Sequence, residues 1–156
     1  LAEAAAAFAR ADHAAQRADL FRLAFLLKEG GVYADADDRR AASFDTILPP
    51  GTTFAACQEI YGTLGNNILA AAPGHPVIAR TLALAAEAVN RGDHDTVWLS
   101  TGPGLLTRAF AGEVAADPSA AWLSGLLVRE PGDAARLIEM HCPARYKRTA
   151  RHWSRT

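Results

Sequence analysis

The chain has 156 residues, which is enough for one domain with a sizeable core, and it contains 35 Ala but only 2 Lys beside 14 Arg. Charged residues make up 21% of the chain and the net charge is −1, so the composition excludes a generally basic nucleic-acid-binding protein and a highly charged disordered chain. Residues 145–156 carry five positive charges and no acid, which leaves −6 on residues 1–144 and predicts that this basic tail faces an anionic group.

Residues 2–29 are predicted to be helical, in one piece or two, because Ala is the strongest helix former and apolar residues recur at helical spacing in the second half. Gly30 and Gly31 should end this helix, one of them in a left-handed conformation. Residues 32–34 then have the pattern of a short buried strand, which leads directly into the acidic residues at 35–38.

Further strands are predicted at 52–59, 66–72 and 126–129. Pro76 suits the first position of a helix that runs to about Asn90, with Gly92 after its end. A second such helix should begin near Pro103 and continue to about Glu113. The order of helices and strands is mixed, so we expect an α/β fold in which residues 1–156 form a single domain.

The cysteines and the apolar runs bear on the location of the protein. Cys57 and Cys142 are too few for a disulfide scaffold, which favours a reducing compartment. No apolar run reaches the length of roughly 18 residues that a membrane span needs. We therefore expect a cytoplasmic protein and leave peripheral membrane association open; the start at Leu1 rather than Met leaves an upstream segment open as well.

The acidic run at 35–38 is the strongest candidate for a functional site. If the strand continues through it, Asp35 and Asp37 project from one side and Asp38 from the other. Two converging carboxylates call for a cation, and hard oxygen ligands suit Mg²⁺ or Mn²⁺. The simpler alternative is a solvated turn.

The spacing on either side of the glycines predicts a polar cluster of Asp19, Arg22, Asp35 and Asp37. Arg22 lies about 12 Å along a helix before Gly30, and Asp35 lies about 13 Å along a strand after Gly31. If the turn folds the strand back along the helix, Asp35 comes level with Arg22, while Asp19 shares the helix face of Arg22. The alternative is an ordinary surface ion pair between Asp19 and Arg22.

Four segments resemble one known family. The stretch 18–38, ADLFRLAFLLKEGGVYADADD, closely resembles the signature of the sugar-transferring DXD family, glycosyltransferase family 32, and of the related glucosyltransferase domains of large clostridial toxins. The stretch 66–76, NNILAAAPGHP, the loop 101–103, TGP, and the segment 151–153, RHW, are similar to later motifs of that family. The resemblance implies a GT-A-like nucleotide-diphospho-sugar transferase fold.

The resemblance also implies roles for residues around the donor sugar. Asp19 and Arg22 would hold sugar hydroxyls, and Asp35 would bind ribose or sugar. Tyr33 would line the nucleotide pocket, and Asn66 would face the sugar from a neighbouring strand. A core aromatic and a strand-end amide are the alternatives for these last two residues.

A divalent ion and a closing tail complete the implied site. Asp37 would bind Mn²⁺ or Mg²⁺ together with Asp35, and His152 would complete the metal shell. The alternative for His152 is an exposed tail histidine with no such role. The catalytic pair would be Asp35 and Asp37. From its charge, the tail at 145–156 is predicted to fold over the nucleotide sugar, with Trp153 packed on the substrate side, and the alternative is a solvated basic end.

The implied reaction transfers a hexose from a nucleotide sugar to a saccharide or other hydroxyl acceptor, with retention of configuration. Negative charge grows on the leaving diphosphate, and a metal ion held by the DXD motif would stabilise it as a Lewis acid. The family's usual first strand, which grips the nucleotide base, is missing before the Ala-rich helix. We therefore expect an incomplete domain or a degenerate relative.

Two other functions remain open at this point. The first is a phosphatase of the haloacid dehalogenase type, whose DXD motif also follows a strand, although Asp38 stands where Thr or Val is usual there. The second is a non-catalytic, α-rich interaction module that uses the Ala-rich helix as its partner face.

Overall fold

The computed structural model describes residues 1–92 and 95–143. Its main sheet has four strands in the order β1-β4-β3-β5, and β2 and β6 form a separate antiparallel pair. Within the main sheet β4 pairs antiparallel with β1 and β3, whereas β5 runs parallel to β3. The strands are β1 (Gly31–Ala34), β2 (Arg39–Arg40), β3 (Phe54–Gln58), β4 (Leu64–Ala71), β5 (Leu126–Arg129) and β6 (Ile138–Glu139).

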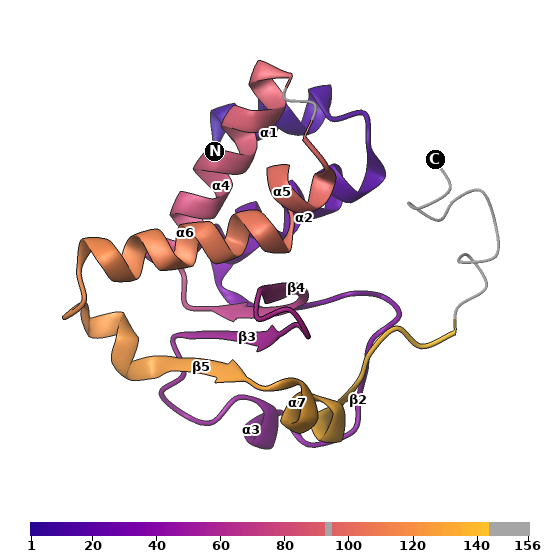
Figure 1. Cartoon of the computed structure of the whole chain (residues 1–156), viewed down its shortest axis with the longest axis vertical. Helices are drawn as coiled ribbons and strands as arrows, with labels where there is room; N and C mark the ends of the chain where they lie inside the picture. Colours follow the sequence, from indigo (N-terminus) through magenta and orange to yellow (C-terminus); the bar gives the residue numbers. More distant parts are fainter. Residues whose placement is uncertain (93–94, 144–156) are drawn as a thin grey trace.

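One layer of helices covers one face of this sheet, and Figure 1 shows α3 and α7 on its other side. The large core lies between the helical layer and the sheet, and Phe54 and Leu69 enter it from β3 and β4. The helices are α1 (Ala2–Arg10), α2 (Ala14–Glu29), α3 (Phe44–Ile47), α4 (Pro76–Arg91), α5 (Val97–Ser100), α6 (Pro103–Ala116), the short 3₁₀-helix η1 (Ala121–Gly125) and α7 (Pro131–Leu137).

The opposite face of the sheet carries a smaller core. Cys57 and Ile68 point to this side because side chains alternate along a strand, and they pack against Ala134 of α7 and Ile138 of β6. The β2–β6 pair therefore lies beside the end of the main sheet. This arrangement carries the chain after β6 back to the acidic turn that follows β1.

The turn from α2 into β1 requires glycine. Gly30 has φ 68° and ψ −160°, a region that is open in practice only to glycine. A Cβ atom at this position would lie 2.6 Å from Cδ of Pro73 and 2.9 Å from the carbonyl oxygen of Ala71. The tight turn sends β1 back along α2, as the two glycines predicted.

Several predicted elements agree closely with the structure, and the mixed α/β fold is confirmed. The N-terminal helix is split into α1 and α2, and Gly92 ends α4 in the left-handed conformation. One prediction is wrong: β1 is not buried, because it lies at the sheet edge, where Val32 is 41% exposed. In residues 1–92 and 95–143, no helix is long and apolar enough to cross a membrane.

The whole of the predicted basic tail lies outside the described residues. Residues 145–156, including His152 and Trp153, are among the residues that the structure does not describe. Their predicted roles as a lid, a metal ligand and a substrate contact therefore stay predictions.

Candidate functional site

The acidic residues occupy a turn and not the strand from which their orientation was predicted. β1 ends at Ala34, and the Asp38 N–H donates to the Asp35 carbonyl at 2.9 Å, which closes the turn. The strict alternation of a strand therefore does not apply to Asp35 and Asp37. The turn divides the acids into two groups, with Asp35 facing α2 and with Asp37 and Asp38 facing the chain after β6.

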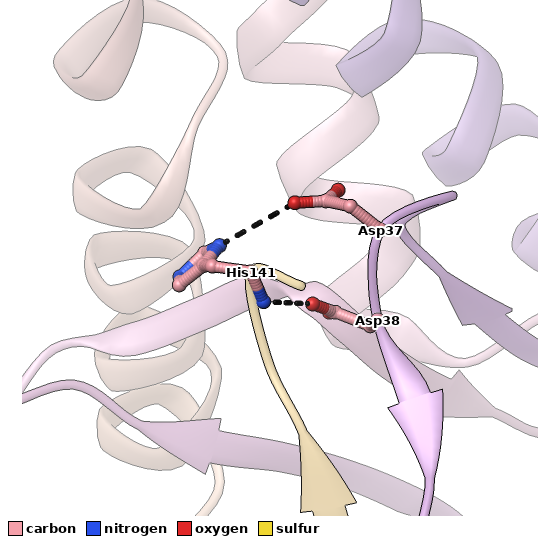
Figure 2. A group of neighbouring side chains, drawn as sticks. All are labelled: Asp37, Asp38 and His141. Carbon is pink, nitrogen blue, oxygen red and sulfur yellow. Dashed lines mark hydrogen bonds and ion pairs between the residues drawn. The ribbon is translucent and has the colours of Figure 1, made fainter. Parts of the chain in front are cut away.

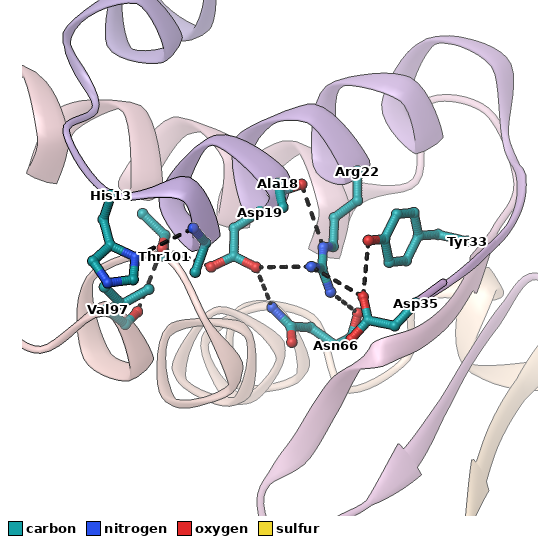
Figure 3. A network of polar contacts seen from close by, with 10 residues as sticks. His13, Ala18, Asp19, Arg22, Tyr33, Asp35, Asn66, Val97 and Thr101 are labelled. Atoms are coloured by element: carbon teal, nitrogen blue, oxygen red, sulfur yellow. Dashed lines mark hydrogen bonds and ion pairs between the residues drawn. The ribbon is translucent and has the colours of Figure 1, made fainter. Parts of the chain in front are cut away.

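Arg22 on α2 is the centre of the first group (Figure 3). Its Nη2 atom lies 3.4 Å from Oδ1 of Asp19 and 3.3 Å from Oδ1 of Asp35. Its Nη1 donates to the Asn66 carbonyl, and the guanidinium stacks at 4.2 Å from the ring centroid of Tyr33. The contact between Arg22 and Asp35 shows that helix and strand run side by side, as their lengths predicted.

Asp19 is held from several elements at once. Its Oδ1 accepts from Nδ2 of Asn66 at 2.8 Å, and its Oδ2 accepts from the Thr101 hydroxyl at 2.7 Å. Burial raises the pKa of Asp19 to about 6, against the opposing effect of the Arg22 guanidinium and of these hydrogen bonds. With 4% of its surface exposed, Asp19 acts within the protein and supports Arg22.

Asp35 is the member of this group that reaches the solvent, since 30% of its side chain is exposed. The Tyr33 hydroxyl donates to Oδ1 of Asp35 at 2.8 Å, on the same oxygen that faces Arg22. Among the described residues, Oδ2 of Asp35 has no such contact. Burial raises the pKa of Asp35, although Arg22 and the Tyr33 hydrogen bond oppose this effect. Asp35 can therefore offer one oxygen to a ligand while the other holds its orientation.

The second group joins the turn to the segment after β6, as Figure 2 shows. The His141 N–H donates to Oδ1 of Asp38 at 2.8 Å, and Nδ1 of His141 lies 3.9 Å from Oδ2 of Asp37. One ligand atom from each of Asp37, Asp38 and His141 lies within 4.8 Å of the others. His141 has φ 57°, a conformation unusual for a residue other than glycine, and such backbone often marks functional sites.

Two neighbouring asparagines on β4 link the groups to the sheet. Asn66 donates to Asp19, whereas Asn67 donates through Nδ2 to Oδ2 of Asp38 at 2.8 Å. Successive residues of a strand face opposite sides, so this pair serves both groups of acids. The Asp35 N–H also donates to the Asn67 carbonyl at 2.8 Å, which fixes the start of the turn against β4.

The sequence spacing predicted a cluster of Asp19, Arg22, Asp35 and Asp37, and the resemblance added Tyr33 and Asn66. The structure brings all of these residues into the first group except Asp37, which lies with Asp38 and His141. Sequence reasoning missed four contributors to the two groups, namely Asp38, Asn67, Thr101 and His141. The alternation of a strand could have indicated Asn67 as the partner of the face opposite Asn66. Nothing in the local sequence indicates that His141, 103 residues after Asp38, contacts it.

Comparisons with known proteins relate this chain to glycosyltransferases. Residues 2–54 match the family model described as a glycosyltransferase sugar-binding region containing the DXD motif. Toxin Afp18 of Yersinia ruckeri is 33% identical over 105 residues, and a toxin of Photorhabdus asymbiotica is 32% identical over 107 residues. Each match covers 64% of this chain but only 5% and 4% of the respective toxin.

A solved structure shows the same likeness. The PaToxG glycosyltransferase matches with a TM-score of 0.55 and 32% identity over 65% of this chain and 36% of that chain. The chain thus spans about a third of the solved glycosyltransferase and about a twentieth of the curated toxins. Residues 2–54 therefore resemble a glycosyltransferase sugar-binding region that contains the DXD motif, within a fold similar to that of a glycosyltransferase, which confirms the resemblance seen in the sequence.

Proposed function

We propose that this chain handles the donor in a metal-dependent glycosyltransferase, which moves a hexose from a nucleotide sugar to a saccharide or other hydroxyl acceptor. The observation that carries this proposal is the division of the acids on one turn. Asp35 is anchored by Tyr33 and Arg22 and keeps one oxygen open, whereas Asp37 and Asp38 gather with His141. One turn therefore offers a hydroxyl-binding carboxylate beside a cation-binding group.

Asp35 is the proposed contact with a hydroxyl of the sugar or ribose. Arg22 has a side chain only 7% exposed and is engaged by two carboxylates and a carbonyl. Asp19 is equally enclosed. We therefore assign to Asp19 and Arg22 the task of orienting Asp35, so that their sequence-based role as direct sugar contacts passes to Asp35.

The donor set of the second group fits a divalent cation. Ligands about 2.1 Å from a cation in octahedral geometry stand about 3 to 4 Å apart, so the observed separations need only a small contraction. Asp37, Asp38 and His141 would hold the ion, with Mn²⁺ or Mg²⁺ suited to the carboxylates. When bound, the ion would neutralise charge on the leaving diphosphate. Metal roles for Asp35 and His152 remain predictions.

The finer details rest on the resemblance. Transfer of a hexose and retention of configuration are implied by the DXD signature at 18–38. The curated relatives are toxins, which favours an acceptor outside polysaccharide synthesis. We propose that the described residues form part of one domain that acts in the cytoplasm, with peripheral membrane association still open. The phosphatase and the α-rich module have no comparable support.

The test is hydrolysis of a panel of nucleotide sugars by the protein with and without Mn²⁺. Asp37→Asn keeps the side-chain volume but removes the charge that holds the cation, so metal-dependent hydrolysis should fall about 100-fold or more, or about 2.7 kcal/mol in the barrier. Asp12→Asn, which changes an exposed aspartate of the α1–α2 loop, is the matched control. Full activity of Asp37→Asn, or hydrolysis of a phosphate monoester in place of nucleotide sugar, would reject the proposal.

A further inference from the structure

We propose that Thr101, in the loop between α5 and α6, is a positioning residue that holds the Asp35 carboxylate in place at the donor site. It acts through Asp19 and Arg22 and does not itself contact the nucleotide sugar. This inference rests on the proposed function, because it gives a role to the Thr-Gly-Pro loop within the same site.

The first step is the contact between Thr101 and Asp19. Thr101 is 1% exposed, and its hydroxyl lies 2.7 Å from Oδ2 of Asp19. The same hydroxyl is 3.4 Å from the Val97 carbonyl, a much weaker contact that an ordinary helix end would supply. Burial of a carboxylate costs free energy unless hydrogen bonds compensate it, so the Thr101 hydroxyl contributes to stability mainly through its contact with Asp19.

The second step runs from Asp19 to Asp35 through Arg22. Oδ1 of Asp19 and Oδ1 of Asp35 lie 3.4 and 3.3 Å from the same Nη2 atom. The position of that nitrogen therefore depends on both carboxylates. Without the Thr101 hydrogen bond, the Asp19 carboxylate can rotate toward Asn66 and Arg22. The Arg22 guanidinium can then move toward Asp19, which weakens its contact with Asp35.

The loop is shaped to deliver Thr101 to this point. Pro103 occupies the first turn of α6, and the Thr101 N–H donates to the Val97 carbonyl at 3.0 Å. A Cβ atom on Gly104 would lie 2.6 Å from Cζ3 of Trp98, so glycine permits α6 to pack closely against α5. Gly104, the residue after the Thr-Gly-Pro motif, thus serves the packing of the two helices, and Thr101 makes the contact with Asp19.

The experiment compares Thr101→Val with a matched control. Thr101→Val keeps the side-chain shape and removes the hydroxyl that donates to Asp19, whereas Thr101→Ser keeps that hydroxyl. Thr81→Val removes a hydroxyl that is equally buried but donates within α4 to the Val77 carbonyl, away from the site. Kinetics are measured with Mn²⁺ and the nucleotide sugar that the wild-type protein hydrolyses.

We expect kcat to fall about tenfold in Thr101→Val while KM and Mn²⁺ affinity stay within about twofold. Thr101→Ser should recover kcat to within about threefold, and Thr81→Val should keep the wild-type kcat. A wild-type kcat in Thr101→Val, or an equal loss in Thr81→Val, would overturn the inference. If Thr101→Val does not fold, Thr101→Ala makes the same test without a new methyl group facing the carboxylate.

A second readout is independent of catalysis. The Asp35 and Asp38 amides are hydrogen bonded within the turn and to β4, so their hydrogen exchange should accelerate in Thr101→Val and not in Thr81→Val. Unchanged exchange would overturn the inference even in an active protein. Absence of any nucleotide-sugar hydrolysis by the wild-type protein, with accelerated exchange in Thr101→Val, would instead reject the proposed function alone.

Discussion

Arg22 has a side chain only 7% exposed, although arginine is among the residues that proteins bury least. Its burial is tolerated because two carboxylates, a carbonyl and the Tyr33 ring surround it. Such an arrangement is costly unless each group is satisfied, so loss of one member affects the others. The residues of the first group, centred on Arg22, therefore depend on one another, and Asp35 is the member that reaches the solvent.

The contribution of one hydroxyl to this unit can be measured with Tyr33→Phe. The ring that stacks on Arg22 remains, but Asp35 loses the hydrogen bond at its Oδ1 atom. A hydrogen bond to a charged group is worth about 1.5 kcal/mol or more, so kcat/KM for hydrolysis of the donor should fall about tenfold.

The control for this change is Tyr61→Phe. Tyr61 is 87% exposed in the loop between β3 and β4, so removal of its hydroxyl should leave kcat/KM unchanged. Equal activity of Tyr33→Phe and the wild-type protein would show that Asp35 does not need this donor.

At the scale of elements, the pairing of α2 with β1 decides whether the site exists. Gly30 allows the chain to reverse within two residues, and the Gly74 N–H donates to the Leu27 carbonyl at 2.8 Å to hold the next turn against α2. β1 itself contributes little burial, because it lies at the sheet edge. Its position therefore depends on the turn and on β4.

Gly30→Ala should be strongly destabilising, because the new Cβ adds a clash with Pro73 to an unfavourable backbone conformation. We expect the free energy of unfolding to fall by about 3 kcal/mol or more, measured by denaturant unfolding. Gly92→Ala is the matched control, since Gly92 has φ 73° but open space around its Cα, and it should lose only about 1 to 2 kcal/mol. Equal losses in the two variants would mean that the clash is relieved elsewhere.

At the scale of the whole molecule, an aromatic cluster joins the sheet to the helical layer. The His75 ring, at the start of α4, stacks on Phe54 of β3 at 5.1 Å and meets the edge of Trp122 at 5.0 Å. Phe110 of α6 packs against both Phe54 and Trp122. In the described residues neither ring nitrogen of His75 has a hydrogen-bond partner. Burial lowers the pKa of His75 to about 4.

The stability of the fold should depend on pH through His75. Because its folded-state pKa lies below the ordinary 6.5, protonation favours the unfolded chain, and stability is lost as the pH falls from 6.5 toward 4. The loss at pH 5 should be about 2 kcal/mol relative to pH 7.5. Asp19 acts in the opposite direction, because its raised pKa makes protonation below about pH 6 favour the folded state.

The two effects can be separated with His75→Phe, measured by denaturant unfolding at pH 7.5 and pH 5. The variant keeps a ring beside Phe54 but has no titrating group there. Between pH 7.5 and pH 5, its free energy of unfolding should therefore fall by about 2 kcal/mol less than that of the wild-type protein. The same pH dependence in both proteins would mean that His75 is not the group responsible.

Local patterns in the sequence were sufficient for the regular elements that carry the core. The apolar spacing, Pro76 and Gly92 placed α4 to within a residue, and the strand predicted at 126–129 is β5. The relation between Arg22 and Asp35 was also predictable, because one tight turn joins two elements of known rise per residue. These features depend on neighbours in the chain.

Only the tertiary structure decided the features that depend on distant segments. Among the described residues, β1 pairs with β4 on one side and with no strand on the other, so it lies at the edge of the main sheet. The sequence of β1 does not reveal this position. The short helices α3, α5 and α7 and the β2–β6 pair lack a long periodic pattern and form where packing supports them. The grouping of Asp37 and Asp38 with His141 arises in the same way, because β6 returns the chain to the turn after β1. Local sequence thus determined the contact between Arg22 and Asp35, whereas long-range packing brought Thr101 to Asp19 and assembled the candidate metal group.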